Sequence, residues 1–267
     1  MEYLTRFLAA LGRPTLGFLV HLNRMAKLGA DALRWTFIQP FKGQKLRVRS
    51  AIEQSVRIGW DSIPIVAIIA FFVGLILAMQ AAYQLKPFGA TIYVANLVAV
   101  AQTRSLGPII TAIVIAGRSG SAIAAELGTM KVAEEIDALR TMGLNPTGFL
   151  VVPRVLAMCV MLPALVLIAD IVGIFGAYIF SVSALDITSV RFINQTATAL
   201  VMKDVFTGLI KTVFFGIIIV GVGCYQGFIV EGGAEGVGRS TTNSVVVSIF
   251  LIIFADVLFT AMFLFLF

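Results

Sequence analysis

The stretch AGRSGSAIAAELGTMKVAEEIDALRTMGLNPTGFLVVP, residues 116–153, decides how this chain is organised. It lies between long apolar runs, and yet it carries seven charged residues: Arg118, Glu126, Lys131, Glu134, Glu135, Asp137 and Arg140. Charges are costly in a lipid environment unless protein or water surrounds them. We therefore expect this segment to lie in water or against another protein.

The middle of this segment has the pattern of a short amphipathic helix. Four residues share one face at helical spacing: Val132, Ile136, Leu139 and Gly143. Lys131 and Glu135 form an i, i+4 pair on another face, and Gly143 followed by Asn145-Pro146 ends the helix. Two interpretations remain open from periodicity alone. The helix is either a surface loop that caps a membrane domain or a docking helix for a cytoplasmic partner.

Composition places the chain in a membrane. Hydrophobic residues make up 59% of the sequence and charged residues 13%, and the mean hydropathy is +0.99. Soluble domains carry about 25% charged residues. Because a span needs about 20 residues, a chain of 267 residues holds five or six spans and no large soluble domain. We predict an all-α integral membrane protein with about five transmembrane helices.

The expected spans cover residues 61–83, 93–117, 151–183, 205–230 and 244–267. A polar connection is expected at 185–201 and a flexible loop at 231–243. Asp170, within the third span, is expected to face protein, and the last span carries one acid, Asp256. Small-residue pairs predict close helix contacts: Gly74 with Ala78, Gly173 with Gly176, and Gly223 with Gly227.

Basic residues are concentrated at the start of the chain. Ten of the twenty Lys and Arg lie between Arg6 and Arg57, which the positive-inside rule places in the cytoplasm. Residues 1–49 alternate basic groups with apolar stripes and are expected to form amphipathic interfacial helices before a transmembrane domain at 50–267. The stripes are Leu4, Phe7, Leu8 and Leu11, then Phe18, Leu22, Met25 and Ala26. This interleaving with apolar residues disfavours nucleic-acid binding.

Five spans with a cytoplasmic N-terminus place the C-terminus on the other side of the membrane. Under that topology the cytoplasmic side also receives Arg118, Lys131, Arg140, Arg154 and Arg239. The other side keeps only Lys86, Arg104, Arg191, Lys203 and Lys211. The bias supports the orientation and places residues 116–153 in the cytoplasm.

Arg104 is unusual because it lies near the middle of the second predicted span. It follows Gln102-Thr103 and precedes Gly107-Pro108. Either Arg104 faces a polar cavity, or the helix begins later and Arg104 reaches the outer interface. The remaining length before Gly117 is short for a span, which favours the cavity.

Several motifs are weak evidence of chemistry. The single histidine, His21, and the two cysteines, Cys159 and Cys224, form no cluster that predicts a metal site or a disulfide. No HExxH or GxSxG is present. Residues 233–240 differ from a Walker A loop by one residue but lie between two spans, so we expect a connection there. Residues 117–121 suit either a close helix crossing or a helix end at the headgroups.

Taken together, several runs resemble the MlaE family of permeases, related to the YrbE permeases and to a chloroplast lipid permease. The runs begin at Ser105, Ala116, Ala125, Glu134, Met142, Val152 and Gly236: SLGP, AGRSGSA, AELGTM, EEIDAL, MG, VPR and GVGRSTTNSV. The resemblance covers residues 50–267. Ser105 stands where some relatives carry an acid, so polar pairing near Arg104 is expected to differ.

The resemblance implies a homodimeric permease of a bacterial lipid-transporting ABC system in the inner membrane. It implies a cytoplasmic ABC ATPase that holds ATP and Mg²⁺, so no cofactor is expected in this chain. A periplasmic MCE-domain protein, and in some systems a STAS-domain protein, would complete the assembly. The ATPase would dock on a cytoplasmic coupling helix between spans 2 and 3, with contacts from Glu134, Glu135, Ile136, Leu139, Met142 and Gly143.

The resemblance also implies a lipid pocket at the dimer interface, open to the periplasm. Carried onto this sequence, its walls include Leu77, Met79, Gln80, Tyr83 and Arg104. The function implied is ATP-driven movement of phospholipid or a similar lipid between the inner membrane and the MCE protein, in support of outer-membrane lipid asymmetry. The competing class is a stand-alone secondary lipid transporter or scramblase, and a structural assembly factor is a third.

Overall fold

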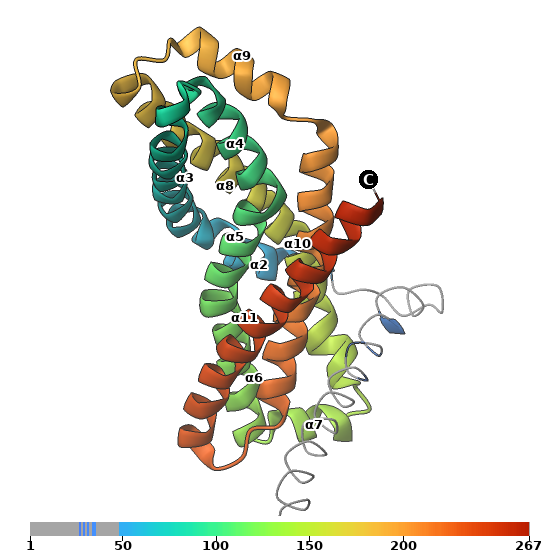
Figure 1. Cartoon of the computed structure of the whole chain (residues 1–267). Coiled ribbons are helices and arrows are strands. Elements are labelled where there is room, and N and C mark those ends of the chain that lie inside the picture. The colour runs from blue at the N-terminus through green and yellow to red at the C-terminus, as the bar shows by residue number, and fades with distance from the viewer. Residues whose placement is uncertain (1–26, 28, 30, 32–33, 36–47, 267) are drawn as a thin grey trace, which may run out of the picture.

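The computed structural model describes residues 27, 29, 31, 34–35 and 48–266. Within these ranges every regular element is a helix (Figure 1). Five continuous helical stretches are long and apolar enough to cross a membrane: Val48–Phe88, Thr91–Val132, Thr147–Ala184, Met202–Phe228 and Gly233–Phe263. The predicted all-α architecture and the number of spans are confirmed. The predicted stripes before residue 27 lie outside the described residues.

The first span consists of two helices joined by a short turn. The amphipathic helix α2 (Val48–Ile58) precedes the 3₁₀ turn η2 (Trp60–Ser62) and the apolar helix α3 (Ile63–Leu85). Pro64 lies in the first turn of α3, where no intrahelical donor is needed. After α3, the turns η3 (Lys86–Phe88) and η4 (Thr91–Tyr93) reverse the chain.

The second span is far longer than predicted. It runs without a break through α4 (Val94–Ala101), the π turn η5 (Gln102–Leu106), α5 (Gly107–Ile115), the π turn η6 (Ala116–Gly120) and α6 (Ser121–Val132). With the turn η4 that precedes it, this stretch has 42 residues and reaches about 60 Å at 1.5 Å per residue, about twice the hydrocarbon thickness of a bilayer. The expectation that the helix ends near Gly117 is wrong, because partners from α2, η2 and α8 neutralise charges that follow.

The third and fourth spans are joined by a helix rather than by a plain connection. The π turn η7 (Thr147–Val151) leads into α8 (Val152–Ala184), and α10 (Met202–Phe228) forms the fourth span. Between them, α9 (Ser189–Ala199) lies across the end of the bundle opposite α7 (Figure 1). The predicted polar connection is therefore a helix, because Phe192 is buried against Tyr178 and gives the segment an apolar face.

The last helix, α11 (Gly233–Leu266), begins eleven residues earlier than expected. The loop predicted at 231–243 is wrong: a turn with positive φ at Gly232 and Gly233 joins α10 to α11 directly. Ser240, Ser244 and Ser248 are buried at four-residue spacing, and α11 packs against α6 and α10. Residues 233–240 therefore form helical turns and not a phosphate-binding loop.

Close backbone contacts hold the spans together. A Cβ on Gly74 would overlap the backbone of Gly173, so α3 and α8 touch at a point where neither has a side chain. A Cβ on Gly223 would lie 3.0 Å from the carbonyl oxygen of Gly120, which joins α10 to η6. The predicted small-residue contacts are confirmed, as is the close helix crossing at residues 117–121. Cys159 and Cys224 are free, as expected.

Replacing Gly74 with Ala tests the contact between α3 and α8. The added methyl group collides with the backbone of Gly173, which cannot move as a side chain can. We expect the free energy of unfolding to fall by about 1–3 kcal/mol, measured by thermal unfolding in detergent. The matched control is Gly221→Ala in α10, where a Cβ meets no atom within 4 Å. A helical glycine in open space gains up to about 1 kcal/mol from this change, so equal effects at both sites would contradict the packing.

Candidate functional site

A buried ion pair joins the last two spans. Lys211 of α10 is 2% exposed, and its Nζ donates to Oδ1 of Asp256 on α11 at 2.9 Å and to Oγ1 of Thr260 at 2.8 Å. The same ammonium donates to the backbone carbonyl of Arg104 at 3.1 Å. Lys211 therefore uses its three donors on two helices, which satisfies the charge in the membrane.

Local sequence explains why the Arg104 carbonyl accepts from a side chain. Pro108 lies four residues later and has no N–H to return to that carbonyl. The intervening residues form the π turn η5, in which the Gly107 N–H reaches back five residues to Gln102. Such turns recur at functional sites. The ammonium of Lys211 thus replaces a missing backbone donor.

The side chain of Arg104 points to the first turn of α10. Its Nε lies 3.7 Å from Oδ1 of Asp204, and its side chain is 44% exposed. An acid in the first turn also suits the positive end of a helix. Because α4 begins at Val94, the alternative in which the helix starts after Arg104 is wrong. Arg104, Asp204, Lys211 and Asp256 together form a charge network with no net charge.

Sequence reasoning missed this network. Lys211 was expected on the far side of the membrane, but it is buried between helices and carries no information about loop orientation. Asp204 was not singled out. The available signal was one lysine in the apolar fourth span and one aspartate in the apolar fifth, since lone charges in two spans usually pair.

A second group of charges joins α2, α6 and α8. Glu126 of α6 accepts from the buried Arg154 at 2.8 Å and from Arg57 at 3.2 Å. Nearby, Arg118 pairs with Asp61 at 3.6 Å and bonds to Ser62. These pairs lie at the α2 end of α3 and neutralise Arg118, Glu126 and Arg154 where the helices continue past the apolar spans.

The predicted docking helix is present but differs in detail. Helix α7 (Glu135–Thr141) is separated from α6 by Glu134, whose φ of 58° breaks the helix. Because of this break, Val132 is exposed and does not share the buried face of Ile136. Lys131 bonds Asp137 at 2.7 Å and not Glu135 as predicted. This hydrogen bond lowers the pKa of Asp137, so its carboxylate stays ionised at a lower pH than that of an ordinary aspartate.

The six predicted docking residues fall into two groups. Ile136 and Leu139 are buried in the main core, with Leu139 8% exposed. Glu134 and Glu135 are exposed, and Met142 is 66% exposed. Gly143, with φ of 74°, ends the segment as expected. The outer surface of this end therefore includes two acidic residues and an exposed methionine.

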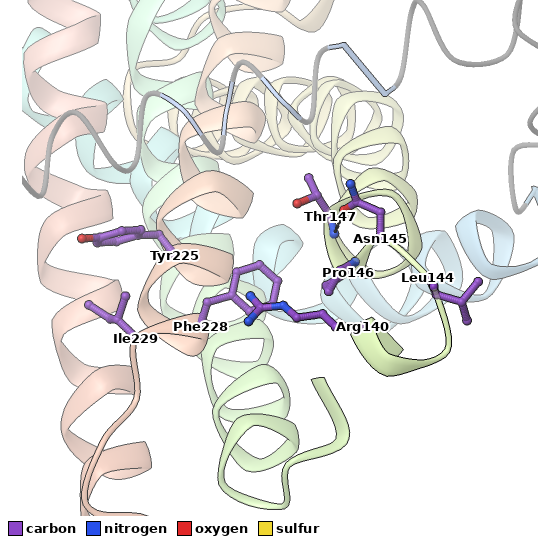
Figure 2. Close-up of a pocket in the computed structure, with 9 residues that line it drawn as sticks. Arg140, Leu144, Asn145, Pro146, Thr147, Tyr225, Phe228 and Ile229 are labelled. Atoms are coloured by element: carbon purple, nitrogen blue, oxygen red, sulfur yellow. Dashed lines mark hydrogen bonds between the residues drawn. The ribbon is translucent and has the colours of Figure 1, made fainter. Parts of the chain in front are cut away.

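A pocket of about 580 Å³ lies beside α7. Its walls come from two segments: Arg140 and residues 143–147 on one side, and Tyr225, Phe228 and Ile229 from the end of α10 on the other. Figure 2 shows the Arg140 side chain extending toward Phe228, whereas Leu144 points away. Arg140 also donates to Asp137 at 3.2 Å. The pocket therefore lies between the C-terminal end of α7 and the end of the fourth span.

The five predicted lipid-contacting residues do not share one surface within the chain. Leu77 packs into a second core cluster between α3, α4 and α8. Met79, Gln80 and Tyr83 are exposed near the end of α3, with Tyr83 83% exposed. Arg104 turns to α10 instead. The exposed α3 residues extend an apolar stripe formed by Ile65, Ile68, Phe72 and Ile76.

Five apolar spans with paired charges between them define a polytopic helical membrane protein whose interior is partly polar. Within that class the chain belongs to the MlaE permease family, since residues 51–262 match the family described as Permease MlaE. The structure and the family together make it a membrane permease subunit.

Relatives extend from bacteria to plastids. A probable ABC transporter permease protein of Rickettsia prowazekii is 42% identical over 79% of this chain and 82% of its own length. A protein of the same description from Synechocystis is 41% identical over 79% and 81%. The chloroplastic protein TRIGALACTOSYLDIACYLGLYCEROL 1 of Arabidopsis thaliana is 37% identical over 82% of this chain and 63% of its own length.

Replacing Lys211 with Met tests the charge network. The change leaves Asp256 buried without its cation, and removing one partner of a buried pair costs about 3–5 kcal/mol. We expect a matching loss in thermal unfolding. In K211M/D256L no charge is stranded, so the double variant should lose much less than the sum of the single changes. Additive losses would contradict the pairing.

Proposed function

We propose that this chain is the permease subunit of an ABC transporter that moves phospholipid or a similar lipid between a bacterial inner membrane and a periplasmic MCE-domain protein. Such transport would support outer-membrane lipid asymmetry. Membership of the MlaE permease family across residues 51–262 carries the proposal. The lipid substrate is supported by a relative that is named after trigalactosyldiacylglycerol, which is a lipid.

The exposed edge of α7 is the proposed docking surface for the ATPase. Met142 and Leu144 are exposed at the end of the long helices, and an exposed apolar group in water favours a protein contact. Glu134 and Glu135 add charge next to them. Their buried neighbours Ile136 and Leu139 attach α7 to the core, so they transmit force and do not form the contact itself.

Charges support an orientation with α7 in the cytoplasm. At the α7 end and along α2 lie Arg49, Arg57, Arg118, Lys131, Arg140, Arg154 and Arg239. The α9 end carries Lys86, Arg191 and Lys203. Cytoplasmic segments are the richer in Lys and Arg. The N-terminus is then cytoplasmic and the C-terminus periplasmic, with α9 facing a periplasmic partner.

The proposed lipid site lies between two copies of the chain. Helices α3 and α11 are the least buried of the five spans, so both have faces free for a second copy or for lipid. Tyr83, Met79 and Gln80 place mixed polar and apolar groups at the α9 end of α3. Such a mixture suits the boundary between acyl chains and headgroups.

The continuous second span is the element that would carry movement from α7 to the lipid site. Closure of two ATPases would move α7, which is fixed to α6 by the Lys131–Asp137 bond and to the core by Ile136. The helix that contains α6 continues to η5 and Arg104. Movement at α7 would therefore change the spacing of the spans around Arg104 and the volume available to lipid.

Two exposed positions test the docking surface. We expect the double variant M142R/L144R to lose at least tenfold of the co-purifying ATPase while its thermal unfolding stays unchanged, because both side chains lie outside the core. Leu139→Arg is unsuitable because it would place a charge in the core. The control is Val190→Arg, an equally exposed apolar position on α9. Retention of the ATPase by the double variant would contradict this surface.

Alanine at Met79 and Tyr83 tests the lipid site. We expect the double variant to retain less than half of the lipid that copurifies with the wild-type complex, since both exposed side chains would contact acyl chains. Lipid is counted by mass spectrometry per mole of protein. Ile171→Ala, which trims an exposed residue of α8, is the control. If both variants carry the same lipid as the wild type, the site lies elsewhere.

A further inference from the structure

Asp170 lies in the middle of the third span with its carboxyl group turned into the protein. It is 7% exposed. A Cβ on Gly107 would overlap Oδ1 of Asp170, so the carboxyl fills the notch that this glycine leaves at the start of α5. Gly173 follows Asp170 by three residues on α8, and a Cβ there would lie 2.6 Å from Nε2 of Gln102. The acid and the amide therefore share one small region between α8 and η5.

Two acceptor oxygens in this region have no donor. Among the residues that the structure describes, neither Oδ1 of Asp170 nor Oε1 of Gln102 receives a hydrogen bond. The Gln102 amide instead donates its Nε2 to the carbonyl of Ala169 at 3.5 Å. In this orientation of the amide, Oε1 is the end that lies without a donor. A buried acceptor without a donor costs free energy, and two such acceptors at one contact are unusual.

Three cations of η5, α10 and α8 are bound to other acids. Residues 63–85 of α3 and 107–115 of α5 contain no charged residue. On η5 and α10, Arg104 pairs with Asp204 and Lys211 pairs with Asp256. On α8 itself, Arg154 pairs with Glu126, more than four turns from Asp170. Nothing in the described part of the chain neutralises the Asp170 carboxylate.

We propose that Asp170 is a proton-binding site: its carboxylate takes one proton from solvent, becomes a neutral acid, and donates that hydrogen to Oε1 of Gln102. One proton removes the buried charge and supplies the donor that the amide lacks. A hydrated cation fits poorly, because the cavity beside Gln102 and Gly107 has a volume of only about 10 Å³, about that of one water.

The bound proton would fix one side of the π turn η5. Gln102 begins this turn, and Lys211 holds the carbonyl of Arg104 two residues later. Proton binding at Asp170 thus attaches η5 to α8, while the Lys211 network attaches it to α10 and α11. Loss of the proton would place two acceptors face to face and separate η5 from α8.

Infrared difference spectroscopy of the full-length protein in lipid vesicles at neutral pH tests the proposal. We expect the carbonyl-stretch band of a protonated carboxylic acid, which shifts in D₂O and is lost in Asp170→Asn. Asp186→Asn is the control, because Asp186 is exposed and asparagine tolerates its positive φ of 52°. In Gln102→Leu the band should remain and move to higher frequency. Absence of the band in the wild type, or its survival in Asp170→Asn, would overturn the proposal.

Thermal unfolding provides a second measurement. Asp170→Asn supplies an N–H in place of the acid's O–H and should leave the unfolding temperature unchanged, whereas Asp170→Ala removes the donor and should lower it by several degrees. Exchange of sodium for choline in the buffer should have no effect on the wild type. A destabilised Asp170→Asn, or an unfolding temperature that depends on sodium, would show that an ionised carboxylate binds a cation there instead.

Discussion

The fold depends on the rule that a charge inside a membrane needs a partner, and Lys211 shows how this chain obeys it. Its ammonium binds a carboxylate and a hydroxyl on α11 and a backbone carbonyl in the second span. The last two spans and the much earlier second span therefore meet at one atom. Pro108 creates the free carbonyl that Lys211 binds, so the helix irregularity and the buried lysine depend on each other.

The same irregular turn lies between the two ends of the molecule. The helix that contains η5 also contains α6, and α6 is tied to α7 by a charged hydrogen bond. A rigid helix of this length transmits displacement along its axis. A π turn within it is a point where the helix can change its conformation. The structure thus joins an exposed surface at one end to a group of paired charges in the membrane without any long loop.

The sequence predicted the elements whose signal is local. Apolar runs identified five spans, and pairs such as Gly74 and Ala78 marked the helix contacts. Prediction from the sequence failed where tertiary partners override the local pattern. Arg118 and Glu126 resembled loop residues, but both lie inside a helix. Asp61 neutralises the first and Arg154 neutralises the second. Likewise, the glycines at 233–238 resembled a loop. The pairing of Lys211 with Asp256 joins residues 45 apart, which periodicity cannot reveal.

The most direct test of the account is to purify the tagged protein in mild detergent from its own host and to identify, by mass spectrometry, the proteins and lipids that come with it. The account predicts a stoichiometric ATPase with Walker motifs, an MCE-domain protein and bound lipid. A chain that purifies alone, with no ATPase even after crosslinking, would contradict the account and favour a stand-alone lipid transporter or scramblase.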